Sequence, residues 1–108
     1  MTTVKVHHTS KRYEGKPWVY WWDLSSKDVE RVSNGENIVF GMKDSDEVFA
    51  LPADILRAYL TKEVVTSRGK GEPHWGIKQY PEDAGMVRLE TPNLPADDWN
   101  RIEKLPVT

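Results

Sequence analysis

The chain has 108 residues, of which 38% are hydrophobic and 30% are charged, and its formal net charge at pH 7 is −2. This is the composition of one folded domain rather than of a disordered chain, and the net charge argues against an overall basic nucleic-acid binder. The absence of cysteine excludes disulfides, thiolate catalysis and cysteine-ligated metal centres.

The sequence also lacks the marks of membrane and secreted proteins. No apolar run approaches the roughly 18 residues that cross a bilayer, and the first residues contain no signal-peptide core. A chain without cysteine fits a reducing compartment. We therefore expect a single domain over residues 1–108, cytoplasmic, with no membrane association and no cofactor.

The charges fall into blocks of opposite sign. Residues 1–22 sum to +3 and residues 61–80 to +2, whereas residues 23–50 sum to −4 and residues 81–108 to −3. Such unevenness indicates a polarised surface and, as one interpretation, a binding face.

The aromatic stretch at residues 17–24 is the strongest feature of the chain and holds three of the five tryptophans. In a strand, Trp18, Tyr20, Trp22 and Leu24 would share one side and Val19, Trp21 and Asp23 the other. Both sides are largely apolar, which is typical of a strand in the middle of a sheet. Either helices cover both faces, or one face is open to a partner.

Before and after this stretch, the pattern predicts a strand over 3–8, a loop over 9–16 and a short helix. The helix has a start signal at Ser25-Ser26-Lys27-Asp28, runs to about Ser33 and ends at Asn34-Gly35. Residues 37–42 and 47–51 read as a hairpin joined by a polar link. Pro52 then opens a second helix with an apolar stripe of Ile55, Leu56, Tyr59 and Leu60.

In the second half, residues 67–73 contain two glycines and a proline and predict an exposed loop. Residues 74–80 and 86–90 predict a second antiparallel pair, and Pro95 predicts a last helix with Trp99, Ile102 and Leu105 on one side. The expected order is β-β-α-β-β-α-β-β-α. We predict an α+β fold with one mostly antiparallel sheet of five or six strands and about three short helices, packed mainly on one face.

The aromatic residues have two interpretations, a core strand or a platform on which bases stack, each base being worth about 1–3 kcal/mol. The candidate stacking residues are Trp21, Trp22 and Trp75. The candidate phosphate contacts are Lys11, Arg12, Lys16, Arg68 and Lys70. The glycines around Lys70 do not form a Walker-type phosphate loop, which needs a glycine before the lysine and a hydroxyl after it.

A catalytic site is harder to assemble from these residues. His74 is a candidate polar residue, but no second histidine stands at metal-ligand spacing, and His7 and His8 would point to opposite sides of a strand. The run Glu14-Gly15-Lys16 has the spacing of a nuclease motif, but no aspartate precedes it. We expect neither a catalytic constellation nor a metal site, and therefore no enzyme.

The ordered set of Trp18 to Trp22, Val48 to Pro52 leading into Ile55-Leu56, and His74 to Ile77 resembles a bacterial module of restriction and other DNA-defence proteins, sometimes attached to nuclease domains. The resemblance covers residues 17 to about 90 and rests on core-like aromatics and a strand-to-helix turn. It implies a stand-alone recognition or accessory module, with no catalytic residue to carry over.

These observations support three hypotheses. The first is a non-enzymatic module that binds nucleic acid, plausibly DNA, through stacking and a basic loop. The second is a protein-interaction or homodimerisation module, such as an inhibitor that mimics nucleic acid through the acids at 44–47 and 97–98, or an accessory subunit of a defence system. The third is a small enzyme in which His74 meets Glu14 or Asp23 in a pocket.

Overall fold

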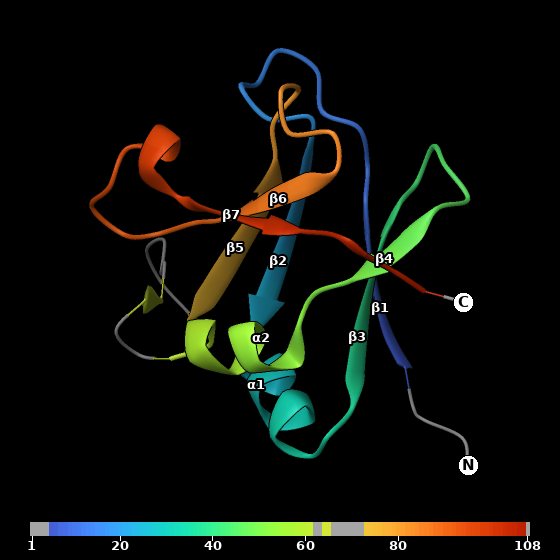
Figure 1. Ribbon diagram of the computed structural model, residues 1–108, viewed down its shortest axis with the longest axis vertical. Coiled ribbons are helices and arrows are strands. Elements are labelled where there is room, and N and C mark those ends of the chain that lie inside the picture. The colour runs from blue at the N-terminus through green and yellow to red at the C-terminus, as the bar shows by residue number, and fades with distance from the viewer. Residues whose placement is uncertain (1–4, 62–63, 66–72, 108) are drawn as a thin grey trace.

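A computed structural model describes residues 5–61, 64–65 and 73–107. Within these residues it contains two α-helices and eight strands (Figure 1). In chain order they are β1 (Lys5–Ser10), β2 (Tyr20–Ser25), α1 (Ser26–Ser33), β3 (Asn37–Met42), β4 (Val48–Ala50), α2 (Ala53–Tyr59), β5 (His74–Gln79), β6 (Met86–Leu89), β7 (Asn100–Glu103) and β8 (Leu105–Pro106). A single 3-10 turn, η2 (Ala96–Asp98), precedes β7.

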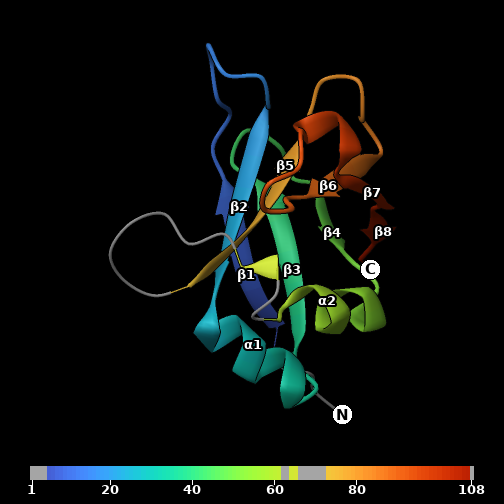
Figure 2. The ribbon, with the colours of Figure 1, turned by 90° about the vertical axis from the view of Figure 1, so that its left-hand side faces the viewer.

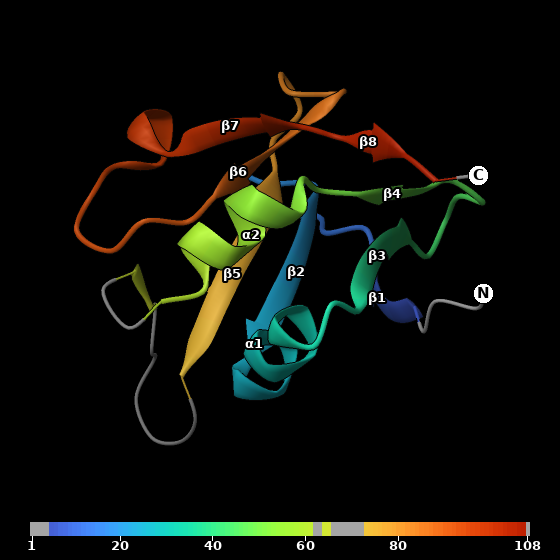
Figure 3. The ribbon, with the colours of Figure 1, turned by 60° about the horizontal axis from the view of Figure 1, so that its bottom comes forward.

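The strands form two four-stranded sheets, with the orders β1-β3-β4-β8 and β2-β5-β6-β7. Strands β1 and β3 run parallel, and every other pair is antiparallel. Strands β7 and β8 are separated only by Lys104, so one extended segment pairs first with β6 and then with β4 (Figure 3). Both helices lie together at one end of the sheets (Figures 1 and 2).

The α+β class and the mostly antiparallel pairing are confirmed, but the arrangement into one sheet is wrong. The aromatic strand β2 lies at the edge of its sheet, not in the middle. Its inner side packs into the core, whereas its outer side is covered by aromatic side chains from distant loops. An edge strand covered in this way has the same two-sided apolar pattern as a central strand, which explains the error.

The first helix begins and ends where the sequence predicts. The backbone amide of Ser25 donates to Oδ2 of Asp28 at 2.8 Å, which satisfies one amide at the helix start. Gly35 has φ of +81°, a left-handed conformation that glycine adopts without a steric penalty. Asp28 is buried and also bonds Nε2 of His8 at 2.8 Å, so the same carboxylate ties α1 to β1.

The predicted hairpin and the helix after it are also confirmed. Phe40 of β3 lies opposite Phe49 of β4 in an antiparallel register, and α2 starts directly after Pro52. Leu56 and Tyr59 from the predicted stripe are buried.

The predicted C-terminal helix is wrong. After Pro95 the chain makes only the turn η2 and then becomes extended through β7 and β8. Residues 97–100 read Asp-Asp-Trp-Asn, all weak helix formers, and Pro106 would interrupt a longer helix. Pairing with β6 and β4 satisfies the backbone instead.

The hydrophobic core lies between the two sheets and centres on Trp22. Its ring meets Phe40 and Phe49 edge to face, with centroid distances of 6.1 and 5.2 Å, and its Nε1 donates to the Gly41 carbonyl at 2.9 Å. Neither helix in the described part of the chain is long and apolar enough to cross a membrane.

Candidate functional site

The outer face of the β2-β5-β6-β7 sheet carries an unusual row of side chains. Strand register places Trp21 opposite Lys78, Lys78 opposite Arg88, and Arg88 opposite Arg101. Because side chains alternate along a strand, these four share the face that points away from Trp22 and the core. Three cations therefore lie side by side on a face that one tryptophan begins.

Lys78 is enclosed rather than solvated, with its side chain only 3% exposed. Its Nζ lies 3.0 Å from Oε1 of Glu90 and 4.0, 5.2 and 5.8 Å from the ring centroids of Trp18, Trp99 and Trp21. A buried ammonium needs both an opposite charge and further electron-rich contacts, and the indole faces supply the second. We call Lys78, Glu90 and these three tryptophans the lysine cage.

Gly76 makes the lysine cage sterically possible. A Cβ at this position would lie 2.5 Å from Oε1 of Glu90 and 3.4 Å from Nε1 of Trp21. The backbone amide of Glu90 also donates to the Gly76 carbonyl at 3.0 Å. The missing side chain therefore leaves the space that the Glu90 carboxylate occupies beside Lys78.

Arg88 continues the pattern across the sheet. Its guanidinium lies 4.4 Å from the ring centroid of Tyr80 and is bonded to the carboxylate of Asp83, which also accepts from Nε of Arg101 at 3.1 Å. Burial tends to raise the pKa of Asp83, but hydrogen bonds from the two guanidiniums outweigh it and lower the pKa. The two arginines of this half of the face are therefore engaged with a carboxylate of the protein itself rather than held ready for a ligand.

The opposite border of the face is an aromatic cluster. The rings of Tyr13, Trp18 and Trp21 contact one another at centroid distances of 6.2 to 6.5 Å, and all three are only partly buried. The loop that holds Tyr13 is closed by its amide, which donates to the Val19 carbonyl at 2.8 Å. We call these three rings the aromatic corner.

The aromatic corner is bordered by cations. Lys11, Arg12 and Lys16, the predicted phosphate contacts on this loop, are all exposed, and Nζ of Lys11 lies 5.1 Å from the Tyr13 ring centroid. Arg12 also pairs with the exposed Glu14 at 3.5 Å. The structure thus brings together the basic N-terminal block and the partly exposed aromatics.

Two of the predicted stacking residues do not belong to this surface. Trp22 and Trp75 are 2% and 4% exposed. Each indole N–H is bonded inside the protein, to the carbonyls of Gly41 and Thr61 respectively, both at 2.9 Å. Neither ring has a face for a base, so their assignment as stacking residues is wrong. Trp21 alone keeps that role.

The other predicted residues are placed less decisively. Arg68 and Lys70 lie outside the described residues, as does most of the predicted loop. His74 begins β5, and its Nδ1 lies 3.0 Å from Oδ2 of Asp23, the carboxylate that the enzyme hypothesis required. Both side chains are about two-fifths exposed. Within the described residues, no group of three or more histidine and acidic side chains is arranged to hold a metal ion.

Tyr59 lies near the same carboxylates but is suited to structure rather than catalysis. Burial strongly raises the pKa of its hydroxyl, and the charges of Glu90 and Asp23 raise it further. The protonated hydroxyl donates to the carbonyls of Gly76 and Glu90 at 2.5 and 2.9 Å. It therefore ties α2 to the strand ends beneath the lysine cage.

Sequence reasoning missed the lysine cage altogether. A signal existed, because Lys78 is the one charged residue inside the aromatic and apolar run Trp75 to Tyr80. The roles of Glu90 and Trp99 had no such signal, since they come from loops whose path the sequence does not predict.

Comparisons with known proteins add no identification. No protein-family model, curated protein or solved structure matches the chain.

Proposed function

We propose that the chain is a non-enzymatic module that binds nucleic acid at the aromatic corner and the basic loop beside it. The observation that carries the proposal is the juxtaposition of three partly exposed rings with three exposed cations, Lys11, Arg12 and Lys16. Rings on which bases stack, next to cations that follow the phosphates, form the usual binding surface for unpaired strands. The resemblance to modules of DNA-defence proteins favours DNA as the ligand.

The lysine cage supports this proposal by fixing the rings in advance. Trp18 and Trp21 rest on Nζ of Lys78, which is itself held by Glu90. A binding surface that is already ordered loses less conformational entropy when the ligand arrives. The cage thus acts behind the surface and is not itself exposed to the ligand.

The test is a fluorescence titration with single-stranded and double-stranded DNA oligonucleotides over a series of salt concentrations. We expect quenching of tryptophan fluorescence and an affinity that falls as salt rises. Neutralising the three loop cations to glutamine should reduce the salt dependence on single strands by about 0.7 for each phosphate that the protein no longer neutralises, hence by about 2 in all.

The matched control removes three other exposed cations from different elements, Lys27, Lys43 and Arg57. This variant has the same net charge as the loop variant, so an equal loss of affinity in both would show a general charge effect and contradict the proposed site. A second variant, Trp18→Ala, should weaken binding while leaving the salt dependence unchanged. Absence of binding at low salt up to about 100 µM protein, the weak end of non-specific binding, would refute the function itself.

The alternative is a homodimerisation module, and one observation favours it. A groove of about 400 Å³ lies between α2 and the β6-β7 edge and is lined by apolar side chains that include Ile55, Val64 and Ile102. A second copy of the chain could bury this apolar lining. Light scattering distinguishes the two functions: a dimer that the variant Ile55→Glu converts to monomer favours the alternative, and a monomeric wild type contradicts it.

A further inference from the structure

Lys104 stands at the junction of β7 and β8 and points into a pocket. Side chains alternate along this extended segment, so Lys104 shares the side of Ile102, which packs against the core, while Glu103 and Leu105 point outward and are exposed. The backbone amide of Lys104 donates to the Gly85 carbonyl at 3.1 Å, which fixes the base of the side chain. The strand geometry therefore directs an amine toward the space between the sheets.

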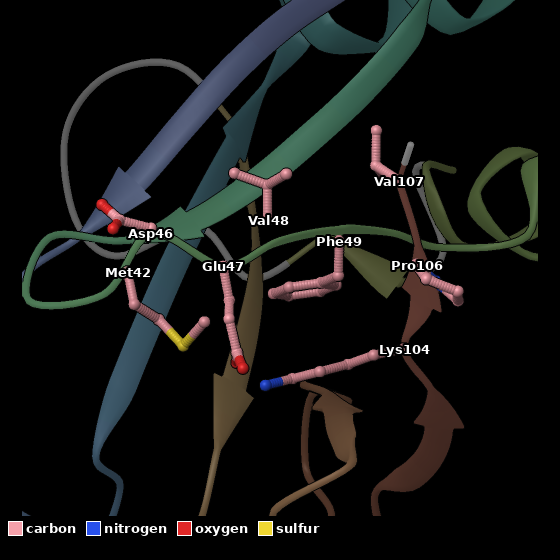
Figure 4. A pocket seen from close by; sticks show the side chains of 8 residues that line it. All are labelled: Met42, Asp46, Glu47, Val48, Phe49, Lys104, Pro106 and Val107. Atoms are coloured by element: carbon pink, nitrogen blue, oxygen red, sulfur yellow. The ribbon is translucent and has the colours of Figure 1, made fainter.

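The pocket is of a size and composition suited to a small molecule. Its volume is about 440 Å³, within the range of roughly 300–1,000 Å³ that is usual for ligand sites. Five of its lining residues are apolar: Met42, Val48, Phe49, Pro106 and Val107 (Figure 4). The charged lining residues are Lys104, Asp46 and Glu47.

The amine of Lys104 is half-buried and has no close ion-pair partner in the described part of the chain. Nζ lies 4.8 Å from the ring centroid of Phe49, and the Glu47 side chain reaches toward it on the same side of β4 (Figure 4). Burial lowers the pKa of Lys104, and the charge of Glu47 offsets this only in part. A larger share of this amine is therefore neutral, and hence nucleophilic, than in an exposed lysine.

The charges around the pocket restrict what it can take. A simple anion would meet Asp46 and Glu47, and a simple cation would meet Lys104. A neutral molecule with an apolar body avoids both conflicts. Among neutral groups, a carbonyl is the one that an unprotonated amine attacks.

We propose that Lys104 is a carbonyl-reactive residue that forms a reversible imine with a small aldehyde or ketone whose apolar body occupies this pocket. The amine lone pair adds to the carbonyl carbon, the oxygen takes up a proton to give a carbinolamine, and loss of water forms the C=N bond. Amine and carbonyl are thus converted to imine and water, with no oxidant or reductant. The site lies on the other sheet from the aromatic corner and does not depend on the proposed function.

The test uses the intact chain with benzaldehyde and cyanoborohydride, which reduces the imine to a stable secondary amine. Peptide mass spectrometry then compares the initial labelling of Lys104 with that of Lys43, an exposed lysine in the neighbouring hairpin link. We expect Lys104 to be labelled several-fold faster below its pKa, with the difference shrinking as pH rises toward the range of an ordinary lysine. Equal labelling of the two residues at every pH would overturn the proposal.

A second aldehyde tests the pocket apart from the amine. Glyoxylate carries a carboxylate that would face Asp46 and Glu47 and has no apolar body, so we expect the preference for Lys104 over Lys43 to fall several-fold. Equal preference with both aldehydes would contradict binding in the pocket. The variant Glu47→Gln removes the charge that raises the pKa of Lys104, and the pH midpoint of labelling should move lower; an unchanged midpoint would contradict the assigned environment.

Discussion

Replacing Lys78 by methionine tests the lysine cage most directly. Lys78 and Glu90 have side chains 3% and 8% exposed and lie 3.0 Å apart. The substitution keeps the length and most of the volume of the side chain but leaves the Glu90 carboxylate buried without its partner. Removing one member of such a pair costs about 3–5 kcal/mol. This is a large share of the roughly 5–15 kcal/mol that stabilises a domain.

Urea unfolding followed by tryptophan fluorescence measures this loss. With a urea dependence of about 2 kcal/mol per molar, a loss near 4 kcal/mol lowers the midpoint by roughly 2 M. The control is Lys11→Met, because Lys11 also lies over an aromatic ring but is exposed. Its free energy of unfolding should change by no more than about 0.5 kcal/mol.

The double variant Lys78→Met with Glu90→Gln removes both charges. We expect it to be more stable than Lys78→Met alone by at least about 2 kcal/mol, since the unpaired carboxylate is gone. The reasoning is refuted if Lys78→Met costs less than about 1 kcal/mol, or if the effects of the two substitutions simply add.

Three further predictions concern the surroundings of the cage and the first helix. Gly76→Ala should cost about 1–3 kcal/mol in unfolding free energy, because the new Cβ would lie 2.5 Å from the Glu90 carboxylate and displace it. Tyr59→Phe should cost about 1 kcal/mol in the same assay through its lost hydrogen bonds. Burial raises the pKa of Asp28, but bonds from His8 and the Ser25 amide outweigh it and hold the pKa below 3.8. Its contribution is therefore complete above about pH 4 and lost as pH falls through the folded-state pKa, so Asp28→Asn should flatten the acid side of a plot of urea midpoint against pH.

The parts of the fold that the sequence predicts are those set by local chemistry. Ser25 and Gly35 bound the first helix, and Pro52 starts the second, because caps and proline act within a few residues of their own position. The hairpin from β3 to β4 is likewise local. These elements form for reasons that can be read within one short window of the chain.

The errors come from pairings between distant segments. The apolar outer side of β2 is covered by Trp18 and by Trp99, which is 78 positions along from Trp21, and no local pattern predicts that cover. The stacking surface was predicted in part, because Trp21 and the loop cations do meet, but Trp22 and Trp75 have opposite strand parity and face the core. Parity alone would have separated Trp21 from Trp22, had the buried side been known.

The passage of one extended segment from β6 to β4 has a mechanical consequence. The two sheets cannot slide or open independently at this border, because the peptide units on either side of Lys104 are hydrogen-bonded into different sheets. A molecule seated against that residue would therefore press on both layers of the protein at once.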